Sequence, residues 1–187
     1  MSAIPGGVIA SKGVAGDGRE MFIEVDRPAE VDGGARCGFR IDGRGEWSVP
    51  GVDGLAALYA ALLRVGELLA QAKAAAGHIR FAGPAERGVP MSAVEEAVIG
   101  VDGIVAGRAF EFDGREHTVW IGRPFAHENG SIMLCPFVVD DREQAVASGW
   151  DGIGALLTAL RMISAWLCLP EDWPLTCPPL RADTTST

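Results

Sequence analysis

The sequence lacks the features that mark membrane, exported or nucleic-acid-binding proteins. No run reaches the ~18 uncharged apolar residues of a membrane span, because polar residues interrupt the longest apolar tract, residues 153–169. No basic segment followed by an apolar run stands at the N-terminus, so we expect no signal peptide and a cytoplasmic location. Basic residues are few: 16 Lys and Arg stand against 25 Asp and Glu, a net charge of −9. This balance argues against nucleic acid or an anionic membrane as a partner.

Catalytic and cofactor motifs are also missing. The chain has no phosphate-binding GxxxxGK[ST], no GxGxxG after a strand, no GxSxG and no HExxH. Its four cysteines stand far apart without a CxxC pair, which predicts reduced thiols rather than a metal or redox site. We expect no cofactor, no metal and no catalytic residue, and a non-catalytic role is favoured over an enzymatic one.

What the chain does have is enough apolar sequence for a core and many turn residues. It contains 187 residues, of which 48% are hydrophobic, and 25 glycines. That composition excludes intrinsic disorder of the whole chain. The length suits one ordinary domain, and we expect residues 1–187 to form a single domain.

An internal duplication organises the sequence. Asp17-Gly-Arg-Glu20 recurs as Asp113-Gly-Arg-Glu116, 96 residues later, and the offset becomes 98 after a two-residue insertion. Between residues 37–70 and 135–168 there are 12 identities in 34 gapless pairs. We therefore predict a first repeat, a connector with a short helix near 92–99, a second repeat and a polar tail, at residues 8–70, 71–103, 104–168 and 169–187.

Both repeats show the same pattern of strands. The Asp-Gly pairs are typical of two-residue hairpin turns, and they predict paired strands at 8–16 and 19–26 and again at 104–112 and 115–122. A third strand carries Cys37 and Phe39, or Cys135 and Phe137 in the copy, on one face. A weaker fourth strand is expected at 46–49 and at 144–147.

A helix closes each repeat. Leucines and other aliphatic residues recur at intervals of 3, 4, 3 and 4 from Leu55 to Leu69 and from Ile153 to Leu167, which is one apolar stripe. Asp53 and Asp151 stand at the helix N-cap positions. The fold class is therefore α+β: a duplicated β-β-β-(β)-α unit, with antiparallel sheets, amphipathic helices on one face and a pseudo-two-fold axis.

Three short motifs resemble an uncharacterised bacterial family, a domain of unknown function present here in two tandem copies. They are Ile121-Gly-Arg-Pro124, the Cys135-x-Phe137 strand, and Gly-x-Asp-x-hydrophobic-x-Ala-Leu from Gly149 to Leu156. The second repeat matches better, since the first has Asp26 in place of Gly122. The resemblance implies the fold and a bacterial origin, and it implies no catalytic residue.

Several charged residues admit a structural and a functional interpretation. The duplicated Arg27 and Arg123 either form surface ion pairs and cap loop carbonyls or bind a ligand. Asp53 and Asp151 are N-caps or, on the other interpretation, paired carboxylates for acid–base chemistry. His117 is either a surface histidine or, with His127 and a carboxylate, a metal ligand, although the spacing fits no ligand signature. The structural interpretation is favoured in each case.

The repeats diverge on the sheet face turned away from Cys37 and Cys135. There the first repeat has Glu24 and Arg40, whereas the second has Trp120, Val138 and Leu134. These three predict an apolar patch, either covered by residues 78–103 and the Trp173 segment or open as a binding surface. Pro136 lacks an N–H donor and predicts an edge strand or a bulge.

The favoured function is an acidic binding protein with no nucleic-acid or membrane partner. The specific hypothesis is an immunity or antitoxin-type protein that masks a basic protein surface, because acidic surfaces speed association with basic partners. An alternative is small-molecule binding or catalysis in a groove between the repeats, near Arg27, Arg123 and His117. A further alternative is a structural subunit that self-associates. The candidate binding residues are Trp120, Leu134, Val138, Arg27, Arg123 and His117.

Overall fold

Each repeat folds into an antiparallel sheet followed by a helix. The computed structural model describes residues 7–16, 19–76, 79–80, 103–128, 130–140, 142 and 144–176. The first repeat and the start of the connector contain β1 (Val8–Gly16), β2 (Arg19–Asp26), β3 (Ala29–Val31), β4 (Gly34–Ile41), β5 (Gly45–Gly51), α1 (Gly54–Ala76) and β6 (Ile79–Arg80). The second repeat contains β7 (Ile104–Phe112), β8 (Arg115–Gly122), β9 (Phe125–Ala126), β10 (Met133–Val139), β11 (Ala145–Gly149) and α2 (Gly152–Leu167). The predicted α+β unit is confirmed in both halves.

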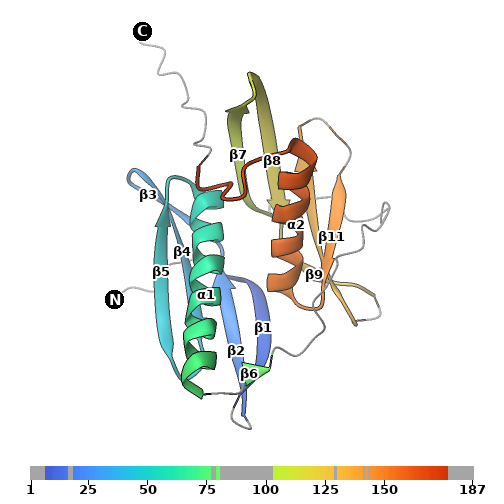
Figure 1. Cartoon of the computed structure of the whole chain (residues 1–187). Helices are drawn as coiled ribbons and strands as arrows, with labels where there is room; N and C mark the ends of the chain where they lie inside the picture. Colours follow the sequence, from blue (N-terminus) through green and yellow to red (C-terminus); the bar gives the residue numbers. More distant parts are fainter. Residues whose placement is uncertain are drawn as a thin grey trace.

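The two sheets have the same topology. In the first sheet the strand order is β5, β4, β2, β1 and β6. The short strand β3 pairs with the same edge of β4 as β2 does, further along β4. In the second, the order is β11, β10, β8 and β7, with β9 beside β8 on the edge of β10. Helix α1 packs on β4 and β5 and α2 packs on β10 and β11, so both helices cover the same side of their sheets (Figure 1). We call the opposite side of each sheet its outer face.

Details of the backbone repeat as well. The first strand of each repeat has a register shift at the same place, between Val8 and Ala10 and between Ile104 and Ala106, 96 residues apart. The predicted hairpin turn is present at Asp113 and Gly114, whose φ values are 51° and 69°, the positive values that a type I′ turn requires. Its counterpart, Asp17-Gly18, lies outside the described residues, as does the helix predicted near 92–99.

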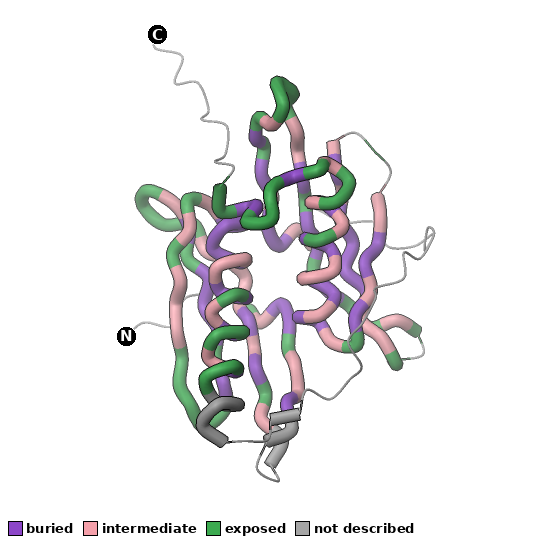
Figure 2. Tube along the Cα trace, in the orientation of Figure 1, coloured by how far each residue is buried: buried purple, intermediate pink, exposed green. Residues whose placement is uncertain are grey.

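The helix stripes form the centre of a core that both repeats share. Four of the five stripe positions in α2 and all five in α1 are buried, and Leu167, the last in α2, is partly buried. Residues 54–71 of α1 are long and apolar enough to cross a membrane by composition alone. Their stripe packs on the first sheet, however, as expected of a core helix in a soluble protein. Figure 2 shows the buried segments lying where helices meet strands.

The Gly-x-Asp motif before each helix has a steric cause. A Cβ on Gly51 would lie 2.2 Å from the backbone nitrogen of Ala57, and one on Gly149 would lie 2.3 Å from that of Ala155. Only glycine lets the last strand approach the first helical turn so closely. The aspartate two residues later then caps the helix: Asp53 Oδ1 accepts from the Ala56 N–H at 2.8 Å, and Asp151 Oδ1 from the Gly154 N–H at 2.7 Å.

Two expectations about strands need correction. The predicted connector, residues 71–103, contains no strand, but Ile79 and Arg80 pair with β1 as β6. Pro136 was expected at an edge or bulge, yet β10 is an inner strand. Pro136 lies between the stretch of β10 that pairs with β9 and the stretch that pairs with β8. No ladder bond is needed from it there, which explains why proline is tolerated.

Candidate functional site

The contact between the repeats is reciprocal. The Lys12 ammonium on β1 lies 2.6 Å from an Asp151 carboxylate oxygen at the start of α2. Ninety-six residues later, Arg108 on β7 binds Asp53 at the start of α1 through two nitrogens, at 2.6 and 2.7 Å. Each helix N-terminus therefore meets the first strand of the other repeat, which is the arrangement of a pseudo-two-fold axis.

Lys12 and Arg108 are not among the predicted site residues, although both are basic at equivalent positions. A basic residue at both of these positions, 96 residues apart, was the signal in the sequence that could have identified the pair. Because each N-cap aspartate already accepts a helix N–H and binds a cation of the other repeat, the carboxylates are engaged in holding the repeats together. Asp53 and Asp151 lie in separate ion pairs.

Arg123 also has a structural contact across the repeats. Its side chain donates to the Val8 carbonyl at 2.7 Å, and its backbone N–H donates to Gly103. The counterpart Arg27 donates its backbone N–H to Gly7 in the same way. The capping interpretation of the arginine pair therefore holds for Arg123.

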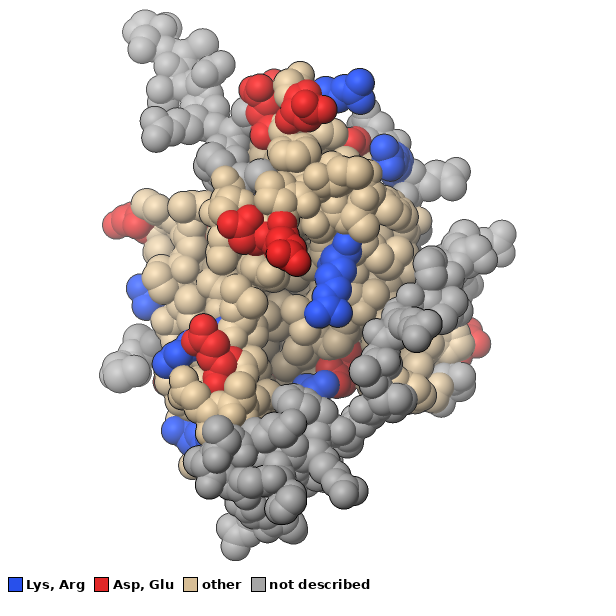
Figure 3. All heavy atoms as spheres, viewed as in Figure 1, with Lys and Arg blue, Asp and Glu red and all other residues tan. Residues whose placement is uncertain are grey.

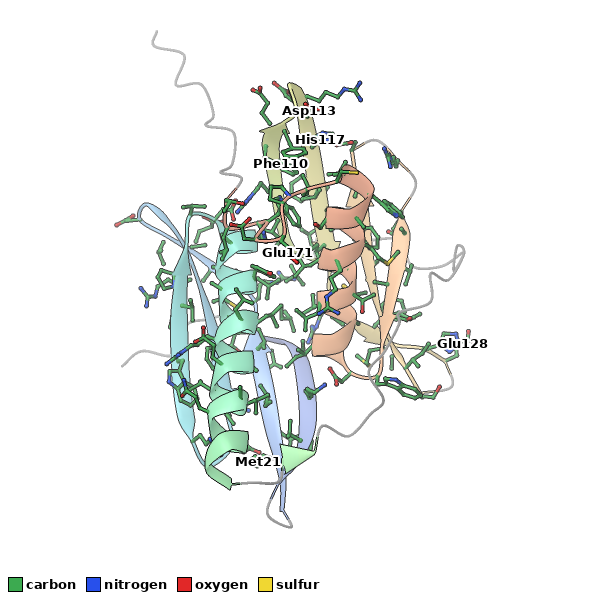
Figure 4. The ribbon with its side chains drawn as sticks, viewed as in Figure 1. Met21, Phe110, Asp113, His117, Glu128 and Glu171 are labelled. Carbon is green, nitrogen blue, oxygen red and sulfur yellow. The ribbon has the colours of Figure 1, made fainter. Side chains whose placement is uncertain are left out.

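His117 lies at the other end of β8 from Arg123. Its Nδ1 is 3.1 Å from Oδ2 of Asp140. The other carboxylate oxygen of Asp140, Oδ1, accepts the Thr118 N–H at 2.9 Å. The ring lies 5.7 Å from that of Phe110 (Figure 4). Six residues of strand separate His117 from Arg123, about 20 Å at 3.3 Å per residue. His117 therefore lies far from Arg123, whereas Arg27 and Arg123 donate to the neighbouring residues Gly7 and Val8. In the described part of the chain no His, Cys, Asp and Glu side chains cluster as metal ligands.

The strand cysteines behave as buried hydrophobes. Cys37 Sγ donates to the Asp26 carbonyl and Cys135 Sγ to the Gly122 carbonyl, the same contact in both repeats. Burial raises the pKa of the Cys37 thiol to about 12, with a further contribution from Asp26, and burial raises the pKa of Cys135 as well. Neither sulfur is a ready thiolate nucleophile at neutral pH.

The outer face of the second sheet carries the most exposed of the predicted binding residues. The Trp120 indole lies flat over Gly107 on β7, where a Cβ would meet the ring at 2.0 Å, and the residue keeps 41% of its surface exposed. Val138 pairs with it across β8 and β10 and is half-buried. We call Gly107, Trp120 and Val138 the Trp120 face.

Two sequence expectations about this face are changed by the structure. Leu134 is only 1% exposed, between Phe125 of β9 and Ser148 of β11, so it lies beneath the surface. Trp173, proposed as part of a cover, packs instead against Phe110 on the helix side, with ring centroids 5.8 Å apart. Residues 81–102, the rest of the proposed cover, lie outside the described residues.

In the first repeat the same outer-face positions are polar. The counterparts of Trp120 and Val138 are Glu24 and Arg40, which form an ion pair across β2 and β4. Ser11 stands where the second repeat has Gly107. The second repeat thus has an indole over a glycine where the first has an ion pair, while the strands underneath pair in the same way.

Acidic residues continue the outer face towards the β7–β8 hairpin tip. Glu111 and Glu116 stand directly opposite one another in the ladder, on the same face as Trp120 by the two-residue alternation. Both are exposed, with Asp113 in the turn between them. Figure 3 shows acidic side chains gathered at the top of the molecule, where the β7–β8 hairpin ends in Figure 1. Like charges facing each other across strands oppose folding, so stability does not account for this pair.

A shallow groove of about 370 Å³ lies on the first repeat between β5 and α1. Trp47, Leu63 and Leu175 line it, and the Arg64–Glu67 ion pair stands at its side. The groove is mostly apolar and has no cluster of titratable groups that would indicate chemistry.

One comparison finds that part of the chain is similar to a family without an assigned function. Residues 12–91, which include most of the first repeat and the start of the connector, match a family described as a domain of unknown function (DUF6968). The match lies on the first repeat, whereas the motifs suggested the second. No curated protein matches the sequence. No solved structure matches the fold.

Proposed function

We propose that the chain is a protein-binding module whose Trp120 face docks on a partner with a basic surface. The observation that supports this most is the difference between the repeats at equivalent positions. Where the first repeat has the Glu24–Arg40 ion pair, the second exposes a tryptophan over a glycine. Tryptophan is enriched among the residues that dominate binding energy at interfaces.

The charge of the partner follows from the surroundings. The opposed Glu111 and Glu116 lie on the same face as Trp120, and the whole chain carries a net charge of −9. Such a surface favours basic partners and repels acidic ones. An apolar anchor beside an acidic pair matches a protein partner that presents an apolar pocket rimmed by Lys or Arg. This is the chemistry that an immunity or antitoxin-type protein would use to mask a basic surface.

The test compares two exposed aromatic residues on equivalent outer faces. The tagged chain, its Trp120→Ala variant and its Phe22→Ala variant are used to capture proteins from native cells, and any captured protein is then purified and titrated. Phe22 is the control because it is exposed on β2 of the first sheet. We expect Trp120→Ala to weaken binding about 30-fold, or about 2 kcal/mol, and Phe22→Ala to leave it unchanged.

Salt provides the second measurement. Surface charges are screened over about 8 Å at physiological ionic strength, so the association rate should fall as salt rises. Equal affinity of the Trp120→Ala and wild-type chains for the captured protein would reject this face as the binding surface. An association rate that does not change with salt would reject the basic partner.

A further inference from the structure

Among the residues that the structure describes, one edge of β7 has no partner strand, whereas the equivalent edge of β1 is paired. Within the described residues β7 pairs with β8 only, whereas β1 pairs with β2 on one side and β6 on the other. On β1 the paired positions are Ala15 with Arg80 and Gly16 with Ile79. The offset of 96 makes Glu111 and Phe112 the equivalent positions on β7.

The hairpin geometry identifies which backbone groups face this edge. A two-residue type I′ turn at Asp113-Gly114 closes on a hydrogen-bonded pair, here Phe112 and Arg115. Antiparallel pairs alternate between bonded and non-bonded. The N–H groups of Ala109 and Glu111 therefore point away from β8. In the first repeat Ala15 and Gly16, the counterparts of Glu111 and Phe112, both pair with β6, so the equivalent stretch of edge is occupied there.

The side chains along this edge define what would fit beside it. On the outer face stand the small Ala109 and the acidic Glu111, which is backed by Glu116. On the inner face are the buried Phe110 and the half-buried Phe112. The hairpin extends beyond both helices at the top of the molecule, and its tip is exposed (Figures 1 and 2).

We propose that the free edge of β7 from Ala109 to Phe112 adds an extended strand of the protein partner, with a basic residue opposite Glu111 and an apolar one opposite Phe112. Strand addition to a sheet edge is a common mode of peptide recognition. The first repeat already contains such a pairing, since the backbone of β6 pairs with β1 at the equivalent positions. This inference rests on the proposed function: it concerns the same partner and the neighbouring part of the same face.

The probe is a capped eight-residue peptide of alternating isoleucine and arginine, with glutamate replacing every arginine in the control peptide. Amide hydrogen exchange is measured on the full chain with and without peptide. We expect the Ala109 and Glu111 amides to exchange rapidly in the free chain and at least 10-fold more slowly with the arginine peptide. The Phe110 amide, which faces β8, should be protected in both states and serves as the internal reference.

Two variants locate the contact. Ala109→Pro removes an N–H that β8 does not use, so the melting temperature should change little while peptide binding is lost. Glu111→Lys keeps the backbone and should reverse the preference in favour of the glutamate peptide. The second variant decides the question if the first one fails to fold.

Several outcomes would overturn the proposal. Ala109 and Glu111 amides that are already protected in the free chain would show that a segment of the chain itself occupies the edge. Binding that survives both substitutions would place the peptide elsewhere. The two proposals fail separately: loss of the cellular partner on Trp120→Ala without peptide protection of β7 rejects only strand addition. Protection of β7 together with unchanged partner binding by Trp120→Ala rejects the Trp120 face.

Discussion

The two repeats have the same backbone and different outer faces. Both keep the glycine that lets strand and helix meet, the aspartate that caps the helix and the cysteine that donates to the preceding strand. These groups all lie on the core side or at the strand–helix junction. The outer faces lie away from the shared core, so one can carry the Glu24–Arg40 ion pair and the other the exposed Trp120. Divergence has occurred where the fold does not constrain the side chains.

A second difference lies in the two ion pairs that join the repeats. The Arg108 side chain is fully buried, binds Asp53 with two nitrogens and also donates to the Pro174 carbonyl. Lys12 makes a single contact with Asp151, and both side chains are 21% exposed. The segment after α2 accounts for the difference, because Trp173 and Pro174 cover the inner face of β7. The interface is symmetric in layout and unequal in burial.

The largest expected loss of stability comes from replacing Arg108 with alanine. The same replacement at Lys12 shows how unequally burial strengthens the two ion pairs. Arg108→Ala removes one partner of a buried pair and leaves the Asp53 carboxylate without its cation and the Pro174 carbonyl without its donor. We expect a loss of about 3–5 kcal/mol in the free energy of unfolding. Lys12→Ala disrupts a partly exposed pair and should cost only about 0.2–1 kcal/mol. Urea unfolding followed by circular dichroism measures both.

The double variant Arg108→Ala, Asp53→Ala is the control for this comparison. It removes both charges, so it should be less destabilised than the sum of the two single variants. Equal costs for Arg108→Ala and Lys12→Ala would mean that the segment after α2 does not seal the arginine in solution.

Replacing the mid-helix leucine with alanine should lower the free energy of unfolding by about the same amount in either repeat. Leu62 and Leu160 occupy equivalent stripe positions and are 5% and 3% exposed. Truncation to alanine removes buried methyl groups and leaves a cavity, at about 2–5 kcal/mol for each site. Thermal melting of Leu62→Ala and Leu160→Ala gives the comparison, with Leu63→Ala as the exposed control on α1.

A single cooperative transition is also expected in both leucine variants, because the buried residues of the two repeats form one core cluster. Separate transitions, with only the substituted repeat melting early, would contradict a shared core. An unchanged melting temperature in either variant would mean that its stripe does not face the sheet.

The sequence predicted the regular elements well because their signals are local. Asp113-Gly114 specifies a hairpin turn by itself, and the 3-4 spacing of leucines specifies a buried helix face. The strands at 8–16, 19–26, 104–112 and 115–122 agree with the structure residue by residue. The short strands β3, β6 and β9 were missed because two or three residues carry no periodicity, and their pairing depends on the partner strand alone.

The contacts that join the repeats could not be read from the sequence in the same way. Asp53 and Asp151 were correctly identified as helix caps, but their second partners lie 55 and 139 residues away. Leu134 looked like part of an exposed patch because it shares a face with Trp120, and only the flanking strands β9 and β11 show that it is buried. Alternation predicts which face a residue occupies and does not predict what lies on that face.

The smallest expected effect concerns Asp26, whose counterpart in the second repeat is Gly122. Burial raises the pKa of the Asp26 carboxyl, and Glu24 and Glu46 raise it further, while Arg40 opposes them. Its carboxylate lies over Gly38, where a Cβ would meet Oδ2 at 2.6 Å. The folded chain therefore binds this proton more tightly than the unfolded chain does.

The sign of the pH dependence follows from that shift. Because the pKa of Asp26 is raised in the folded chain, its protonation contributes to the free energy of unfolding. That contribution is fully present below the pKa of Asp26 in the unfolded chain and is lost as pH rises through its pKa in the folded chain. At neutral pH the ionised Asp26 slightly destabilises the fold. Asp26→Asn, which is neutral and the same shape, should therefore raise the urea midpoint at pH 7 and leave it unchanged at acid pH, where Asp26 is protonated as well. Asp32→Asn, in the exposed β3–β4 turn, is the matched control, and a gain for Asp26→Asn that is as large in acid as at pH 7 would show that the charge of Asp26 is not its cause.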